Sequence, residues 1–257
     1  MKLTKKIALA AAAALMACSA ASAAEKIRVG IDGAYPPFNQ LSASGELSGF
    51  DVDITNALCA EMKADCEFVI QDWDGMIPAL IAGKIDAVVA SMSITEDRLK
   101  KVDFSKKYYN TPPAVAVLKD SDLKGTDISE LAGLTIGAQV STTHANYAEQ
   151  KIPDIDLKLY PTADEYKMEL ESGRVDAVID DGVVLSEWVK SEAGACCKIL
   201  MQLTPDPKIN GEGAGIAVKK GNTELADKLT AAIAAIRANG KYQEINAKYF
   251  DFDVYGD

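Results

Sequence analysis

Apolar and polar residues alternate along the chain in blocks of two different periods. Residues 26–31 alternate polar with apolar side chains, which is typical of a half-buried strand. Between residues 51 and 64 apolar side chains recur every four positions, at Ile54, Leu58 and Met62, which predicts an amphipathic helix. Strand and helix periods therefore follow each other from the start of the folded chain.

The same alternation continues to the C-terminus. Further strands are predicted at 67–70 and 85–90, and near 114–118, 134–139, 157–160, 175–179 and 214–218. Further helices are predicted at 74–82 and at 95–102, where Thr95 is the expected N-cap, and near 142–150, 163–172, 182–190, 222–238 and 241–249. This order predicts an α/β fold with mainly parallel sheets.

Two segments of the chain repeat one pattern 90 positions apart. Residues 82–91 and 172–181 each contain a Gly-plus-basic turn, then an apolar strand that ends in polar residues. The repeat indicates two similar lobes, although strand–helix–strand units in general also resemble each other. Ligands of open α/β sheets bind at the carboxyl ends of strands. Ser91, Ser93 and Asp181, which follow or end these strands, are therefore candidate binding residues.

The first 24 residues are predicted to be a secretory signal peptide. Three lysines lie within the first six residues, an apolar stretch follows, and Ala21-Ser22-Ala23 fits a small-residue cleavage site. The apolar stretch is too short to span a bilayer. An alternative is lipoprotein processing at Leu15-Met16-Ala17-Cys18, which would anchor the protein through Cys18; the downstream site is favoured.

Charge and composition narrow the function classes. Removal of the signal peptide leaves 233 of the 257 residues and changes the formal charge from −11 to −14. Such an acidic chain is a poor candidate for binding nucleic acid or an anionic membrane. The acidic surplus favours cationic ligands, although it also serves solubility. His144 is the only histidine and no cysteine cluster has ligand spacing, so no metal or cofactor is expected.

The cysteines fall into two close pairs apart from Cys18. In an oxidising compartment Cys59 and Cys66 are expected to form a disulfide that ties a helix end to the next strand; the alternative is two buried thiols. Cys196 and Cys197 are adjacent, so they form a strained vicinal bridge or remain free, and free or variably oxidised thiols are favoured.

A series of short motifs carries a family resemblance over nearly the whole mature chain. In order they are Tyr35-Pro36-Pro37-Phe38, Gly49-Phe50-Asp51-Val52-Asp53, Trp73-Asp74-Gly75-Met76-Ile77-Pro78, Ser93-Ile94-Thr95-Glu96-Asp97-Arg98, Asp103-Phe104-Ser105 and the final Lys248–Asp257 segment. The ordered set resembles the periplasmic polar amino-acid-binding proteins of ABC transporters. It is most similar to the group that binds lysine, arginine, ornithine and histidine.

The resemblance implies a type II periplasmic-binding-protein fold. Lobe one would comprise residues 25–110 and 208–257, and lobe two residues 111–207. Two crossovers, near 110–113 and 205–207, would join them, and proline and asparagine in both stretches suit connectors. The resemblance also implies a monomer in the periplasm that partners a permease in the inner membrane.

The resemblance assigns the ends of an amino-acid ligand. Arg98, in the first turn after Thr95, would bind the α-carboxylate through its guanidinium fork, and Ser93 would assist it. Thr143 would supply a second donor from the opposite lobe; Ser141 stands where the family usually has glycine, so the geometry of that turn is open. Asp181 would accept the α-ammonium group.

The ligand side chain would lie between two aromatic residues. Tyr35 and Trp73 match the family positions that flank it, and aromatic faces accept aliphatic stems and attract cations. Asp32 matches the position that meets a distal cationic group, so it predicts a basic ligand. Ala90 stands where that group commonly has serine, which makes one wall more apolar and leaves the preferred ligand open: arginine, lysine, ornithine, histidine or a larger opine-like conjugate.

Two further residues lie close to these positions. Asp180 is expected to point to the opposite face of its strand from Asp181 and to serve structure. His144 either borders the cleft or is a partly exposed helix residue, and the second alternative is favoured.

The sequence leaves three classes of function to compare. A transport receptor that closes over its ligand is favoured. An enzyme on the same scaffold, such as a dehydratase, is less favoured because no Ser-His-Asp arrangement is evident and no catalytic residue is identified. Acid–base catalysis by a carboxylate stays open. A sensory ligand-binding module would have to act by docking to another receptor.

Overall fold

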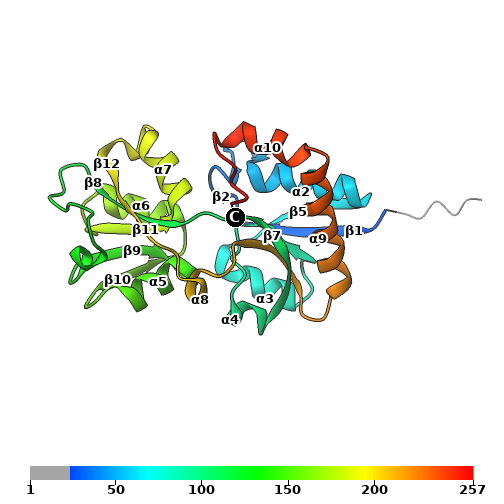
Figure 1. Cartoon of the computed structure of the whole chain (residues 1–257), viewed down its shortest axis with the longest axis horizontal. Coiled ribbons are helices and arrows are strands. Elements are labelled where there is room, and N and C mark those ends of the chain that lie inside the picture. The colour runs from blue at the N-terminus through cyan, green and yellow to red at the C-terminus, as the bar shows by residue number, and fades with distance from the viewer. Residues whose placement is uncertain (1–23, 257) are drawn as a thin grey trace, which may run out of the picture.

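Two lobes lie side by side in the computed structural model, which describes residues 24–256 (Figure 1). Each lobe is built around a five-stranded sheet with helices against it. Lobe one contains both the first and the last elements of the chain, and lobe two is formed by the middle. The predicted signal peptide, which includes Cys18, lies outside the described residues except for its last residue, Ala24.

The sheet of lobe one has the strand order β5-β1-β6-β13-β7. Strands β5, β1 and β6 pair in parallel, whereas β13 pairs antiparallel with both β6 and β7. Four of the five strands therefore run in one direction. The strands are β1 (Lys26–Ile31), β5 (Asp65–Ile70), β6 (Ala87–Val88), β7 (Val102–Tyr109) and β13 (Ala214–Lys219).

The sheet of lobe two repeats this arrangement in the order β10-β9-β11-β8-β12. Strand β8 is the one that runs against the other four. The strands are β8 (Pro113–Leu118), β9 (Thr135–Gln139), β10 (Asp156–Tyr160), β11 (Ala177–Asp181) and β12 (Cys197–Gln202). The predicted α/β class with mainly parallel sheets is confirmed.

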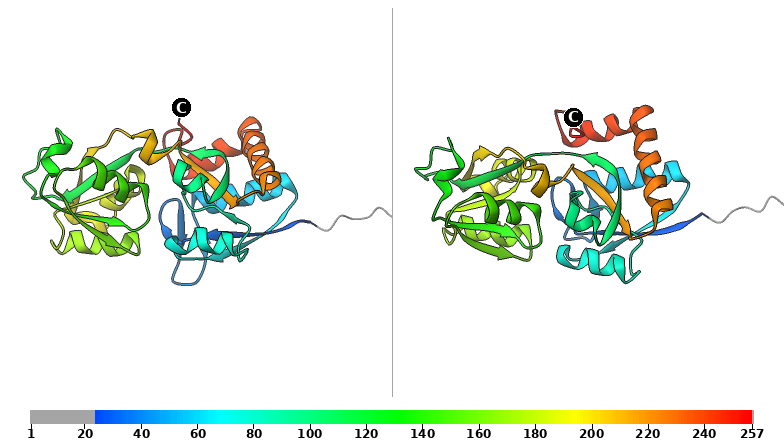
Figure 2. Two further views of the ribbon diagram at one scale, coloured as in Figure 1. Left: turned by 90° about the horizontal axis from the view of Figure 1, so that it is seen from below. Right: turned by 60° about the horizontal axis from the view of Figure 1, so that its bottom comes forward.

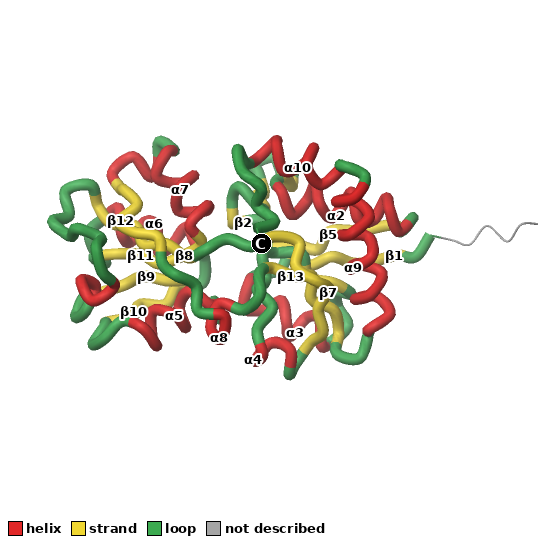
Figure 3. The backbone as a smooth tube through the Cα atoms, in the orientation of Figure 1, coloured by secondary structure: helices red, strands yellow, loops and turns green. Residues whose placement is uncertain are grey.

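Helices cover the sheets of both lobes (Figure 3). In lobe one they are α2 (Phe50–Met62), η1 (Trp73–Gly75), α3 (Met76–Ile81), α4 (Glu96–Leu99), α9 (Thr223–Ala238) and α10 (Lys241–Tyr249). In the middle of the chain they are η2 (Ile128–Leu131), α5 (Thr143–Lys151), α6 (Ala163–Glu171), α7 (Gly182–Lys190), η3 (Ala193–Cys196) and α8 (Pro207–Asn210). A small sheet of β2 (Ala34–Tyr35), β3 (Asn39–Leu41) and β4 (Leu47–Ser48) completes lobe one.

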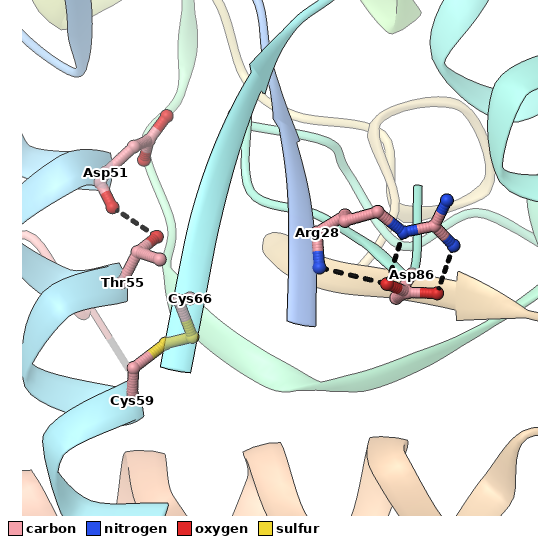
Figure 4. Close-up of a disulfide and its surroundings, with 6 residues drawn as sticks. All are labelled: Arg28, Asp51, Thr55, Cys59, Cys66 and Asp86. Carbon is pink, nitrogen blue, oxygen red and sulfur yellow. Dashed lines mark hydrogen bonds and ion pairs between the residues drawn. A yellow bond between two sulfur atoms is a disulfide. The ribbon is translucent and has the colours of Figure 1, made fainter. Parts of the chain in front are cut away.

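The two segments that share a sequence pattern occupy matching places in the two lobes. The carboxylate of Asp86, just before β6, accepts the backbone N–H of Arg28 at 2.9 Å. The carboxylate of Asp176, just before β11, accepts the backbone N–H of Thr135 at 2.8 Å. Each aspartate thus joins its strand to the neighbouring parallel strand in the same way. In lobe one the Arg28 guanidinium also pairs with Asp86, at 2.7 Å and 2.9 Å (Figure 4).

Two segments pass between the lobes. Residues 110–112 lead from β7 to β8, and residues 203–213, which include α8, lead from β12 to β13. Both can be followed in Figure 2 as the green and orange stretches that join the two bodies. Residues at or just after the carboxyl ends of strands from both sheets face a common space between the lobes.

Five strands, β2, β3, β4, β7 and β12, were not predicted, and several element bounds differ from the predicted ones. Strands β2, β3 and β4 have only two or three residues each, too few to show a period in the sequence. Strands β7 and β12 both pair with register shifts, and such bulges break the alternation of period two that identifies a strand. The helix predicted at 95–102 ends at Leu99 because β7 begins at Val102. The strand predicted at 85–90 is short, since β6 pairs only at Ala87 and Val88.

The cysteines behave differently in the two pairs. Cys59, in α2, and Cys66, in β5, form a disulfide, as predicted (Figure 4). Cys196 is exposed and Cys197 is buried, and both are free thiols whose sulfur atoms lie 3.1 Å apart. Burial, together with the contact to Cys196, raises the pKa of Cys197 to about 12.

Within residues 24–256 no helix is long and apolar enough to cross a membrane.

Replacement of both Cys59 and Cys66 by alanine is expected to lower the free energy of unfolding by about 2–3 kcal/mol, because the bond closes a short loop in the unfolded chain. Denaturant unfolding of the two proteins measures the difference. A reducing agent should destabilise the wild type by a similar amount and leave the double variant unchanged. Equal stability of the two proteins would show that the bond does not restrict the unfolded chain.

Candidate functional site

A cavity lies between the lobes at the strand ends. Its water-accessible volume is about 30 Å³. Lobe one contributes Asp32, Tyr35, Trp73, Ala90, Ser91, Ser93 and Arg98, and lobe two contributes Gln139, Thr142, Thr143 and His144. Seven of the eight binding residues expected from the sequence line it. The eighth, Asp181, lines an adjoining hollow together with Tyr35, Ser91, Ser93 and Thr143.

Arg98 is held in place by both lobes. Thr95 caps α4 and accepts the backbone N–H of Arg98 at 3.3 Å, as predicted for an N-cap. The guanidinium donates to the carbonyl of Ser93 at 3.0 Å and, across the cleft, to the carbonyl of Ser141 at 3.1 Å. Burial lowers the pKa of Arg98 to about 10, so the group stays charged at neutral pH. Among the described residues no acidic side chain forms an ion pair with it, which leaves it able to bind an anion.

Asp32 follows β1 and lacks a counter-charge in the described part of the chain. Burial, together with the charges of Asp72 and Asp164, raises its pKa to about 6. A desolvated carboxylate without a partner is costly, and a cation in the cavity would lower that cost. The cavity therefore holds a half-buried positive group, Arg98, and a separate half-buried negative group, Asp32.

Two aromatic rings line the same cavity. Tyr35, in β2, is buried, and Trp73 begins η1. The centre of the Arg98 guanidinium lies 5.2 Å from the centroid of the Trp73 ring, within the range of a cation–π contact. The indole Nε1 of Trp73 is buried and has no hydrogen-bond partner among the described residues.

The opposite wall comes from the turn between β9 and α5. The hydroxyl of Thr142 accepts the N–H of Ala145 at 3.1 Å and donates to the carbonyl of Gln139 at 2.7 Å, so it caps α5. Ser141 has a φ of 61°, the left-handed region that glycine adopts most easily. The turn therefore keeps a glycine-like backbone with serine in that place. Thr143 is buried, and its hydroxyl has no partner within residues 24–256.

Asp181 has a local role as well as a place beside the cavity. One carboxylate oxygen accepts the N–H of Val183 at 2.8 Å and that of Val184 at 3.4 Å, which caps α7. The other accepts the hydroxyl of Thr111. Burial raises the pKa of Asp181 to about 6.

Ser91 has a different local contact. It donates its hydroxyl to the buried Asp51 at 3.1 Å, and so holds the segment that follows β6.

Asp180, expected to serve structure on the opposite face of its strand from Asp181, forms a contact between the lobes that was not predicted. Its carboxylate accepts the hydroxyl of Tyr35 from lobe one at 2.6 Å. His144 Nδ1 lies 2.9 Å from the same oxygen, and the imidazole is 17% exposed and lines the cavity. Gln139, the last residue of β9, and Thr142, in the turn that follows, also line the cavity, and their place at a strand end is the signal that could have indicated it.

Among the described residues no group of three or more histidine, cysteine, aspartate or glutamate side chains has the arrangement of a metal site. The chemistry that the cavity offers is recognition of a small charged molecule. It combines the Arg98 cation, the Asp32 carboxylate with Asp181 in the adjoining hollow, two aromatic walls and hydroxyl donors.

The family model for bacterial extracellular solute-binding proteins, family 3, matches residues 27–252. This chain belongs to that family. It is 46% identical to the L-arginine-binding protein of Pseudomonas aeruginosa, over 98% of this chain and 99% of the relative. It is 38% identical to the histidine-binding periplasmic protein of Salmonella typhimurium, over 98% and 99% respectively. The predicted family resemblance is confirmed.

Solved structures agree with this assignment. An ancestral arginine-binding protein bound to arginine matches with a TM-score of 0.79 and 37% identity, over 88% of this chain and 98% of that chain. An ancestral amino-acid-binding protein, described as a precursor of cyclohexadienyl dehydratase, matches with a TM-score of 0.78 and 31% identity, over 88% and 95%. The two-lobed fold is that of the type II periplasmic binding proteins.

Replacement of Asp32 by asparagine is expected to raise the free energy of unfolding of the ligand-free protein at pH 7 by about 1–3 kcal/mol. The folded pKa of about 6 exceeds the ordinary value of 3.8, so the folded state binds this proton more tightly. The wild type therefore loses stability as pH rises from about 4 through about 6, and the variant lacks this loss.

Denaturant unfolding at pH 4 and pH 7 measures both effects. Asp122→Asn, which removes an exposed carboxylate from lobe two, is the control and should change stability little. If Asp32→Asn were less stable than the wild type at pH 7, the Asp32 carboxylate would already have a stabilising partner within the protein. The argument for a cationic ligand would then be lost.

Proposed function

We propose that this protein captures a free basic amino acid between its lobes and delivers it to an ABC-transporter permease in the inner membrane. The observation that carries the proposal is the pair of unmatched charges in one cavity, Arg98 and Asp32. A basic amino acid supplies both missing partners, because its α-carboxylate matches the guanidinium and its side-chain cation matches the carboxylate. The names of the arginine-binding and histidine-binding relatives agree with this class.

The remaining groups complete the recognition of the ligand. Thr143 and Ser93 assist Arg98 at the α-carboxylate, one from each lobe. Asp181 accepts the α-ammonium group through a carboxylate that also caps α7 and accepts the Thr111 hydroxyl. Tyr35 and Trp73 flank the aliphatic stem of the ligand side chain.

Binding requires the lobes to close. Residues 25–110 with 208–257 form one moving unit and residues 111–207 the other, and the bend lies in the two connections between them. A ligand that touches Arg98 in one lobe and Asp181 in the other stabilises the closed state, which the permease then recognises. The protein acts as a monomer in the periplasm after removal of the signal peptide.

The choice among arginine, lysine, ornithine and histidine depends on the end of the side-chain pocket. Ala90 makes one wall apolar, so only Asp32 and the neighbouring polar groups receive the distal cation. Arginine is the first candidate because a planar guanidinium pairs with a carboxylate through two hydrogen bonds.

An enzyme is the second candidate, supported by the likeness to a precursor of a dehydratase. Asp32 and Asp181, whose pKa values burial raises to about 6, are carboxyl groups able to exchange protons near neutral pH. An assay for dehydration of a cyclohexadienyl acid tests this directly. Product formation that Asp181→Asn abolishes would favour the enzyme.

A thermal-shift screen of refolded, ligand-stripped protein against the amino acids, ornithine, citrulline and an opine tests the ligand class. A ligand at 100 times its dissociation constant adds about 2.7 kcal/mol, which raises the melting temperature by about 5–11 °C. We expect the shift with basic amino acids. A shift only with neutral or acidic ligands would contradict the role of Asp32.

Replacement of Arg98 by alanine is expected to weaken binding of the ligand found in the screen at least about 30-fold, because it leaves the ligand carboxylate desolvated and unpaired. Titration calorimetry measures the change, and circular dichroism checks the fold. Arg174→Ala, which removes an exposed arginine paired with Glu169 in lobe two, is the matched control and should bind normally. Tight binding by a folded Arg98→Ala variant would remove Arg98 from the site.

A further inference from the structure

Asp180 is a buried carboxylate to which three side chains and one backbone group converge. Only 2% of its side chain is exposed. One oxygen accepts the hydroxyl of Tyr35 at 2.6 Å and the backbone N–H of Asp181 at 2.8 Å, and it lies 2.9 Å from His144 Nδ1. The other oxygen accepts the hydroxyl of Tyr166.

The charge on Asp180 is maintained by these neighbours. Burial alone would raise the pKa of this carboxyl, but the charge of the nearby His144 and the hydrogen bonds from Tyr166 and Tyr35 outweigh burial and lower it. An ionised acceptor forms stronger hydrogen bonds than a neutral one. The hydroxyl of Tyr35 therefore meets a strong, preorganised acceptor.

The contacts divide between the lobes. His144 in α5, Tyr166 in α6 and the N–H of Asp181 belong to lobe two, like Asp180 itself. Tyr35 in β2 belongs to lobe one, and it is the only lobe-one residue among those described that donates to this carboxylate. When the lobes separate, lobe two retains an assembled acceptor and loses only the tyrosine.

We infer that Asp180 is a positioning residue for closure: it receives the Tyr35 hydroxyl when the lobes come together and fixes the tyrosine ring against the cavity. The inference rests on the proposed function, because it assumes that closure accompanies ligand binding. Tyr35 then has two separate parts, a ring that contacts the ligand and a hydroxyl that joins the lobes.

Asp180 is not among the residues that line the cavity, so its hydrogen bond with Tyr35 affects affinity differently from a contact with the ligand. A contact between the lobes changes the population of the closed state, and apparent affinity changes by the same factor for every ligand that needs that state. Loss of the Tyr35 hydroxyl should therefore weaken all ligands by one factor and leave their ranking unchanged. A residue that reads the ligand side chain would change the ranking.

Tyr35→Phe tests the inference because it removes the hydroxyl and keeps the ring. We expect the dissociation rate of each ligand found in the screen to rise about 10- to 100-fold, which corresponds to loss of one hydrogen bond to a charged group. Tyr166→Phe is the matched control, since it removes a hydroxyl from the same carboxylate within lobe two. It should lower the free energy of unfolding and change the dissociation rates less than about twofold.

Stopped-flow fluorescence measures the rates, and small-angle scattering measures the separation of the lobes with and without ligand. If Tyr166→Phe speeds dissociation as much as Tyr35→Phe, Asp180 acts through the structure of lobe two and the inference fails. Unchanged rates for Tyr35→Phe overturn it as well.

The two proposals fail separately. If no amino acid binds the wild type, the proposed function is lost, and scattering of the ligand-free proteins then decides the inference alone. Tyr35→Phe should be more open than both the wild type and Tyr166→Phe; equal scattering from all three would refute the closure contact.

Discussion

Desolvation of unmatched charge is the constraint on which the site depends. Arg98 and Asp32 lie in one cavity, yet neither has a partner of opposite charge among the described residues, and burial shifts both pKa values toward the neutral form. An ion pair between Arg98 and Asp32 would have stabilised the ligand-free protein. Their separation instead leaves the protein complementary to a molecule that carries both charges, so part of the stability of the protein is exchanged for recognition.

The fold supplies two walls by repeating one arrangement. Both sheets have the same order and the same single reversed strand, and in each an aspartate, Asp86 or Asp176, joins two neighbouring parallel strands. The disulfide and the Arg28–Asp86 ion pair cross-link lobe one (Figure 4), and Cys66 and Asp86 lie at the amino ends of β5 and β6, opposite to the strand ends that line the cavity. Motion at the two connections changes the space between the lobes, where the charged and aromatic groups lie.

Prediction from sequence succeeded where the signal is local and failed where it is not. The N-cap role of Thr95 depends on residues close in sequence, and so does the disulfide between Cys59 and Cys66. Both were predicted. Strands β7 and β12 were not, because bulges in their pairing remove the alternation that marks a strand. Seven of eight expected site residues line one cavity because strand ends of an α/β sheet collect at one edge.

By itself the sequence determined the α/β class, the internal repeat, the helix caps and the identity of the charged groups near the strand ends. Periodicity and capping act within a few residues, so the chain carries them wherever it folds. Only the tertiary structure decided that Asp180 faces Tyr35, 145 positions away, and that His144 stands beside it. Such contacts depend on how the lobes are oriented by their connections, which no local pattern of side chains encodes.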